Sequence, residues 1–147
     1  MSVVFRSPPN AMQHFKNRPQ FQAALAGKLV AKSTHFAMHQ VELNLQTHPF
    51  LPALFSANDL WMGAMVPKRW AKRAVTRNTI KRQIYSVSAA FHNAFPPAAI
   101  LVRLRREFSR QVFPSATSVE LRNAVRAELL GLMQTAQVTR LSQEPAS

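Results

Sequence analysis

Residues 60–82 read LWMGAMVPKRWAKRAVTRNTIKR, and this stretch decides how the rest of the chain is arranged. Its first seven residues, 60–66, are almost entirely apolar and predict a buried strand, which Pro67 stops. A short basic connector follows, and a helical pattern begins at about residue 73 and continues to about residue 94. The stretch therefore predicts a strand that leads through a basic connector into a helix.

The predicted helix over residues 73–94 is amphipathic. With 100° of rotation per residue, three apolar side chains stay within about 40° of Ile80 and complete a stripe for the core: Ile84, Val87 and Phe91. The other side carries basic and hydrogen-bonding residues: Arg77, Asn78, Lys81, Arg82 and Tyr85. Pro96 and Pro97 end the helix.

Two more segments carry strand patterns. Residues 33–45, STHFAMHQVELNL, alternate in polarity and predict a strand. One face of that strand would carry His35, Ala37, His39, Val41, Leu43 and Leu45, and the other Phe36, Met38 and Gln40. Residues 98–105, AAILVRLR, predict another strand, with Arg103 and Arg105 on one face. Residues 46–58 have a loop composition, and one further strand could lie there or arise from a split of residues 31–45.

Two helices flank these strands. The first is expected at about residues 18–26, with Asn17 as its cap, Pro19 in its first turn and Gly27 after its end. The last is expected over residues 118–134, where Thr117 and Glu120 have the spacing of a capping box. Its apolar stripe would consist of Leu121, Val125, Leu129, Leu132 and Met133.

Helices and strands in this mixed order predict an α+β fold, a two-layer sandwich with a central sheet of about four strands and three helices. The chain has 147 residues, and 47% of them are hydrophobic, which is enough to bury a core. We expect a flexible N-terminal arm over residues 1–15, a single domain over residues 16–137 and a flexible C-terminal tail over residues 138–147.

The charge of the chain is strongly positive and unevenly distributed. There are 19 Lys and Arg residues against 6 Asp and Glu, a formal net charge of +13. Residues 60–106 contain no acidic residue at all. A solvated helix face usually alternates its signs, so a block of one sign indicates a polyanionic partner, either nucleic acid or an anionic membrane surface.

Composition argues against several classes of protein. Without cysteine there is no disulfide framework, thiolate zinc site or cysteine nucleophile, which fits a reducing, cytoplasmic compartment. The N-terminus lacks the apolar region of a signal peptide, and residues 83–102, the longest uncharged stretch, contain too many polar residues and prolines to span a membrane. The acidic residues are scattered, which argues against a carboxylate metal centre. His35 and His39 could share a strand face, but nothing near them indicates an acid–base pair.

These observations favour a protein that binds nucleic acid over an independent nuclease. No helix-turn-helix pair is visible, which favours RNA over sequence-specific DNA binding. Arginine groups fork onto phosphate oxygens and lysine adds a mobile charge, so the basic connector and the following helix are the candidate interface.

Residues 63–82, GAMVPKRWAKRAVTRNTIKR, resemble the signature of the bacterial ribonuclease P protein subunit. In that signature a strand ends in Gly-Leu-x-Val, a pair of lysines and a short connector follow, and Arg-Asn-Arg-x-Lys-Arg lies on a helix. The resemblance covers roughly residues 15–135. It implies an α+β fold in which a central helix crosses between parallel strands with left-handed chirality, an exception to the usual hand.

The resemblance also implies a function. The family's protein subunit binds a catalytic RNA, which hydrolyses precursor tRNA with Mg²⁺ and removes the 5′ leader, while the protein helps to hold that leader. No catalytic residue is then expected in this chain, and the implied partners are the catalytic RNA and precursor tRNA, with no membrane and no obligate protein partner. The RNA-contacting motif is matched by Lys68, Arg69, Lys72, Arg73, Arg77, Asn78, Lys81 and Arg82, and the leader-binding cleft by Phe21 and Phe36.

Four residues depart from the family's pattern. Thr79 stands where a second arginine of the motif is usual, and Leu25 where a second phenylalanine of the cleft is common. His39 stands where a tyrosine is sometimes found, and Pro67 replaces a small residue. The alternative function is a basic ribosomal or translation-associated RNA-binding protein without a catalytic assembly. A membrane-surface binder is a weaker alternative, because the core needs the apolar stripe of the 73–94 helix.

Overall fold

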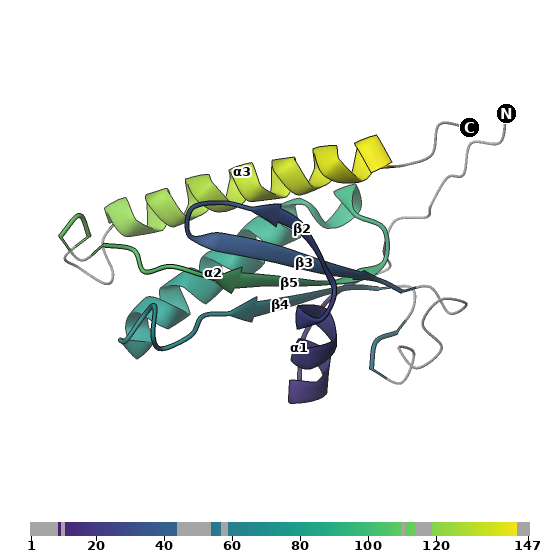
Figure 1. Cartoon of the computed structure of the whole chain (residues 1–147), viewed down its shortest axis with the longest axis horizontal. Helices are drawn as coiled ribbons and strands as arrows, with labels where there is room; N and C mark the ends of the chain where they lie inside the picture. Colours follow the sequence, from purple (N-terminus) through teal and green to yellow (C-terminus); the bar gives the residue numbers. More distant parts are fainter. Residues whose placement is uncertain are drawn as a thin grey trace, which may run out of the picture.

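A mixed sheet separates a short helix from two long ones in this computed structural model (Figure 1). The structure describes residues 9, 11–43, 54–56, 59–109, 111–113 and 119–143, with side chains up to residue 137. The elements of these ranges are β1 (Met12–His14), α1 (Arg18–Leu25), β2 (Lys28–Lys32), β3 (Phe36–Glu42), β4 (Leu60–Met65), α2 (Ala74–Ala90), the 3₁₀ turn His92–Ala94, β5 (Ala98–Leu104) and α3 (Val119–Gln143). In space the strands follow the order β1-β4-β5-β3-β2.

Strands β4 and β5 lie side by side in the sheet and run parallel. Leu60 pairs with Ala98 and Met65 with Arg103, and nearly every residue of both strands is buried. Parallel neighbours need a long connection, and α2 provides it. This arrangement confirms the strands expected over residues 60–66 and 98–105, and it is the strand–helix–strand crossover that the family resemblance implies.

Both faces of the sheet are buried, and alternate residues of each strand enter different cores. On β3, Phe36 and Met38 enter the larger core beneath α2 and α3, whereas Val41 enters the smaller core beneath α1. This confirms the division of faces expected for these residues. The predicted helix stripes are confirmed as well, since the following residues are all buried in the larger core: Ile80, Ile84, Val87, Leu121, Val125, Leu129, Leu132 and Met133.

Helix α1 begins and ends where the sequence predicts. The side chain of Asn17 accepts a hydrogen bond from the Gln20 N–H at 3.1 Å, and the Gln20 side chain accepts one from the Asn17 N–H at 3.3 Å. These two bonds make a complete capping box, which satisfies amide groups at the helix start. Gln20 also donates to the carbonyl of Leu54 at 2.7 Å, so the same side chain ties α1 to the segment that precedes β4.

The strand expected over residues 33–45 begins later, because the chain turns at residues 33–35. The Ser33 N–H donates to the Phe36 carbonyl at 2.8 Å, and β3 starts only at Phe36. The extra strand that a split would create is β2, which starts before the expected segment and pairs with β3 in antiparallel fashion. Only Ala31 of β2 is fully buried, so this edge strand leaves little hydrophobic pattern in the sequence. The end of the expected strand, residues 44 and 45, lies outside the described residues.

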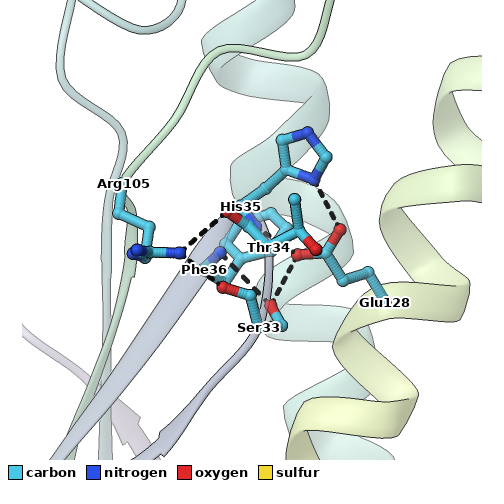
Figure 2. A network of polar contacts seen from close by, with 6 residues as sticks. All are labelled: Ser33, Thr34, His35, Phe36, Arg105 and Glu128. Carbon is cyan, nitrogen blue, oxygen red and sulfur yellow. Dashed lines mark hydrogen bonds and ion pairs between the residues drawn. The ribbon is translucent and has the colours of Figure 1, made fainter.

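Glu128 of α3 holds this turn in place (Figure 2). One carboxylate oxygen accepts hydrogen bonds from the Ser33 hydroxyl at 2.5 Å and the His35 backbone N–H at 2.7 Å. The other oxygen lies 2.6 Å from His35 Nδ1. Arg105 adds two hydrogen bonds to the carbonyls of Ser33 and Thr34, at 2.7 and 2.9 Å. The network therefore joins the β2–β3 turn, the end of β5 and α3.

The prediction of a flexible arm over residues 1–15 is wrong for its last part, because Met12–His14 forms strand β1 parallel to β4. The Phe15 N–H donates to the Met62 carbonyl at 2.9 Å, and the Phe15 ring covers Gly63. A Cβ at Gly63 would come within 2.3 Å of that ring, so only glycine fits there. A strand of only three residues is too short to show an alternation of polar and apolar side chains in the sequence. It forms because it pairs with β4. Most of the remaining arm lies outside the described residues.

Helix α3 starts near its expected position and continues past its expected end at residue 134. The prediction of a flexible tail over residues 138–147 is wrong up to Gln143, because the backbone is helical to that residue. The apolar stripe continues to Ala136, which is buried in the larger core, and residues 134–143 contain no glycine or proline that would end the helix. Thr117, the expected cap, lies outside the described residues.

We expect Glu128→Ala to lower the free energy of unfolding by about 2–3 kcal/mol, since hydrogen bonds to a charged acceptor contribute about 1.5–3 kcal/mol and their donors lose their partner. Gln134→Ala, at an exposed position of the same helix, is the matched control and should change stability little. Urea unfolding measures both variants. Equal stability of the two variants would show that the turn does not depend on Glu128.

Candidate functional site

The connector between β4 and α2 is a tight turn that exposes basic side chains. The Pro67 carbonyl accepts hydrogen bonds from the N–H groups of Trp70 and Ala71, each at 3.1 Å. Lys68 and Arg69 lie at the exposed tip of this turn. The Arg69 guanidinium lies 5.3 Å from the centroid of the Trp70 ring, a cation–π contact that limits how far the arginine moves.

Arg77 of α2 holds the other end of the connector. Its Nη1 donates to the carbonyls of Ala71 at 3.0 Å and Lys72 at 2.8 Å. A guanidinium has five N–H donors, so Arg77 keeps others for a ligand while it fixes the connector. The sequence assigned Arg77 only to RNA contact, and the structure adds a positioning role.

The N-terminus of α2 is open to an anion. Arg73 occupies the cap position without a side-chain hydrogen bond to the helix, and the first turn contains no acidic residue. The first amide groups of a helix have no partner within the helix, and the helix dipole makes this end partly positive. An uncapped start among basic side chains is therefore suited to a phosphate group.

The eight residues of the predicted RNA-contacting motif all lie on the connector and the first turns of α2. Six are exposed to solvent: Lys68, Arg69, Lys72, Arg73, Asn78 and Arg82. Arg77 and Lys81 are half-buried. Thr79, which stands in the place of the usual arginine, is buried and donates its hydroxyl to the Val75 carbonyl at 2.9 Å. The helical phase predicted from the sequence therefore keeps all eight residues out of the core, and together they are called the basic surface below.

The two phenylalanines assigned to one cleft lie on opposite faces of the sheet, so that pairing is wrong. Phe36 is completely buried in the core beneath α2 and α3, where its ring lies 5.9 Å from that of Phe108. Phe21 is half-buried on the α1 side, and its ring contacts Phe15 edge to face at 5.1 Å. Only Phe21 has a surface that a ligand could reach.

The face of the sheet that α1 covers, called the α1 face below, carries a cluster of aromatic residues that the sequence did not assign to a site. Phe15 contacts Phe55 at 5.4 Å between ring centroids, and Phe55 contacts Trp61 at 5.5 Å. The Lys16 ammonium lies 6.0 Å from the centre of the Trp61 ring. Phe15 belonged to the expected arm and Phe55 to the expected loop, so their pattern gave no signal. The alternation of β4, which puts Trp61 and Gly63 on one face, is the signal that could have located this surface.

His39 and Arg103 lie beside one another on the same face of the sheet as Phe21. Arg103 Nε donates to His39 Nε2 at 2.9 Å, which requires a neutral imidazole. Burial lowers the pKa of His39, the nearby charge of Arg103 lowers it further, and the Gly27 carbonyl opposes both effects. His35 lies in the turn before β3, bound to Glu128 and stacked on Phe108 at 3.9 Å. The two histidines therefore do not form an acid–base pair.

Within the described ranges, no three His, Asp or Glu side chains gather closely enough to hold a metal ion together. No helix of those ranges has the length and apolarity to cross a bilayer.

Comparisons with known proteins agree on one family. The family model described as Ribonuclease P matches residues 10–128. The ribonuclease P protein component of Bordetella parapertussis is 32% identical over 123 residues, which cover 83% of this chain and 88% of that protein. The component of Paraburkholderia xenovorans is 32% identical over 93 residues, covering 62% of this chain and 67% of that protein. The solved RNase P protein of Staphylococcus aureus has the same fold, with a TM-score of 0.60 at 19% identity, over 86% of this chain and 96% of that chain.

Replacement of Arg77 tests whether its side chain holds the connector in place. We expect Arg77→Ala to lower the free energy of unfolding by about 1–3 kcal/mol, since two backbone carbonyls lose a charged donor. Lys81→Ala, one turn further along α2 and without a hydrogen bond in the described structure, should leave stability nearly unchanged. Thermal and urea unfolding compare the two. Equal effects would mean that Arg77 does not hold the connector.

The lowered pKa of His39 predicts a pH dependence of stability. Below the unfolded-state pKa of about 6.5 the unfolded chain binds a proton that the folded chain resists, so stability falls as pH decreases through that range. His39→Gln removes this titration while other groups remain. The stability advantage of the wild type over the variant should therefore shrink between pH 7 and pH 5, as measured by urea unfolding. A pH-independent difference would contradict the neutral imidazole.

Proposed function

Because the chain belongs to the ribonuclease P protein family, we propose that its connector and α2 bind the catalytic RNA and that its α1 face binds the 5′ leader of precursor tRNA. The family is the protein component of a ribonucleoprotein endoribonuclease that processes the 5′ ends of tRNA, so the RNA component is its partner. The family comparisons do not favour the alternative of a basic ribosomal or translation-associated protein.

The RNA interface is proposed on one observation: a surface with only positive charges lies on a helix that the core holds in place. Residues 60–106 contain no acidic residue, and the basic side chains of the connector and α2 lie exposed or half-exposed on one side of the helix. The opposite side of α2 is fixed in the core by Ile80, Ile84 and Val87. The helix therefore presents its charges in one orientation, and the uncapped helix start adds partial positive charge to them.

The α1 face supports the second part of the proposal. Single-stranded nucleic acid is bound by aromatic rings that stack on bases and by cations that contact phosphates. Phe21 offers a partly exposed ring next to the cluster of Phe15, Phe55 and Trp61. Arg103 lies on the same face of the sheet, positioned by His39. Phe36 takes no part in this proposal, because it is buried on the other face.

The proposal also covers the Mg²⁺ ion, the hydrolysis and the place where the protein acts. Mg²⁺ prefers oxygen ligands from carboxylates and phosphates. Within the described ranges no three His, Asp or Glu side chains gather to enclose an ion. We propose, as the family resemblance implies, that the phosphates of the RNA hold the Mg²⁺ and that the RNA component carries out the hydrolysis. We propose that the protein acts in the cytoplasm, on precursor tRNA.

We expect binding to the RNA component to depend strongly on salt. If about five to eight phosphates are neutralised, the logarithm of the binding constant falls against the logarithm of salt concentration with a slope of about −4 to −7. Lys81→Ala should weaken binding by about 1–3 kcal/mol and reduce the slope by about one. Lys32→Ala, at the exposed edge of β2, is the charge-matched control and should bind like the wild type. A wild-type slope flatter than about −2 would exclude the basic surface as the interface.

Phe21→Leu tests the leader-binding face, because leucine preserves most of the packing but removes the ring. Loss of one stacked base should reduce the affinity for precursor tRNA by about 1–3 kcal/mol in the reconstituted enzyme, with little effect on mature tRNA. Phe36→Leu is the control for a core residue, and it should lower stability without changing the ratio of the two affinities. An unchanged ratio in Phe21→Leu would show that Phe21 is a core residue.

A further inference from the structure

A groove whose lining residues are mostly of polar types lies between α2 and α3, beside the basic surface of α2. The cavity measures about 360 Å³. The side chain of Val75, which lines it, is 46% exposed, which shows that the groove is open to solvent. It is lined by Val75, Asn78, Thr79, Arg82, Gln83 and Arg122. Arg122 comes from α3, a helix to which the sequence assigned no function.

The lining of the groove has the composition of an anion site. Arg82 and Arg122 bring one guanidinium from each helix, and none of the lining residues is acidic. Within the described part of the chain, neither arginine has an ion pair or hydrogen bond to its side chain. Two unpaired positive charges beside one cavity repel each other, and an anion between them would remove that repulsion.

The backbone of the two helices fixes the two arginines relative to each other. Leu121, next to Arg122, is buried in the core shared with Ile80 and Ile84 of α2. One turn further along α3, Arg126 donates to the Ser86 hydroxyl of α2 at 3.3 Å. The helices therefore run side by side in the same direction (Figure 1). The groove is a feature of a packed helix pair, and it does not depend on a loop.

Thr79 is one of the residues that line this groove. Its hydroxyl donates to the Val75 carbonyl one turn earlier in α2, so its polar group is directed to the helix backbone. The departure from the family motif at Thr79 therefore lies in the lining of the same groove as Arg122.

We propose that this groove binds one nucleotide of the catalytic RNA, with its phosphate between Arg82 and Arg122. Guanidinium groups fork onto phosphate oxygens, and the amide groups of Asn78 and Gln83 can hydrogen-bond the ribose 2′-hydroxyl or a base edge. The cavity volume falls within the range of about 300–1,000 Å³ for small-ligand sites. Asn78 and Arg82 also belong to the basic surface, so the groove extends the same interface onto α3. This inference rests on the proposed function of that surface.

The first test uses the full chain and the catalytic RNA at several salt concentrations. We expect Arg122→Ala to bind the RNA about tenfold more weakly at low salt and to reduce the salt slope by about one. Arg18→Ala removes the same charge from the exposed start of α1, on the other face of the sheet, and should bind like the wild type. Both arginines are exposed, and unchanged thermal unfolding would confirm that both variants fold.

Two outcomes distinguish this inference from the proposed function. If Arg122→Ala binds like Arg18→Ala while Lys81→Ala still weakens binding, the groove is not a nucleotide site and the basic surface remains the interface. If all three variants bind the RNA like the wild type, the proposed function of the surface is wrong, and this inference with it.

A second measurement locates the RNA directly. The chain contains no cysteine, so a single cysteine carries a photo-crosslinker at one known position. Val75→Cys at the rim of the groove should crosslink to the catalytic RNA. Leu29→Cys, equally exposed on the edge strand β2, is the control and should not. Crosslinks from Leu29→Cys alone would overturn the proposal.

Discussion

The packing of the apolar stripe of α2 against the sheet is the interaction on which the rest of the structure depends. Ile80, Ile84 and Val87 are buried in the larger core together with residues of β4 and β5, which fixes the rotation of the helix about its axis. That rotation turns the basic residues of α2 outward as one surface, and it places α2 beside α3. Since residues 60–106 carry no acidic residue to balance this charge, the surface is complementary to a polyanion.

The sheet then divides the molecule into two faces with different side chains. Alternation along each strand sends one set of side chains under α2 and α3 and the other set under α1. The first face builds the support for the basic connector, which Arg77 ties to the helix. The second carries Phe21, His39 and Arg103, where a single strand of nucleic acid would lie. Under the proposed function, the catalytic RNA and the leader would contact opposite sides of one small domain.

Local pattern predicted the parts of the fold that have strong periodicity, and it failed where pairing between distant segments decides the structure. The strand before Pro67, the stripe of α2 and the motif on its outer face all follow from periods of two and 3.6 residues. Strand β1 has three residues and exists through its pairing with β4, and β2 is an edge strand with one buried residue. Phe36 was assigned to the cleft by resemblance. The alternation of the strand, however, places Phe36 on the face opposite to His39, and His39 lies on the face that carries Phe21. Arg122 entered no sequence motif, since its partner residues lie on another helix.

Reconstitution tests directly whether the basic surface works through the catalytic RNA. The chain is mixed with a bacterial ribonuclease P RNA at a Mg²⁺ concentration too low for the RNA alone, and leader removal from precursor tRNA is measured. We expect the chain to restore cleavage at the mature 5′ end, and polylysine of matched charge to fail, because the surface presents its charges in a fixed geometry. Restoration of cleavage by polylysine to the same extent, or no restoration by the chain, would contradict the claim.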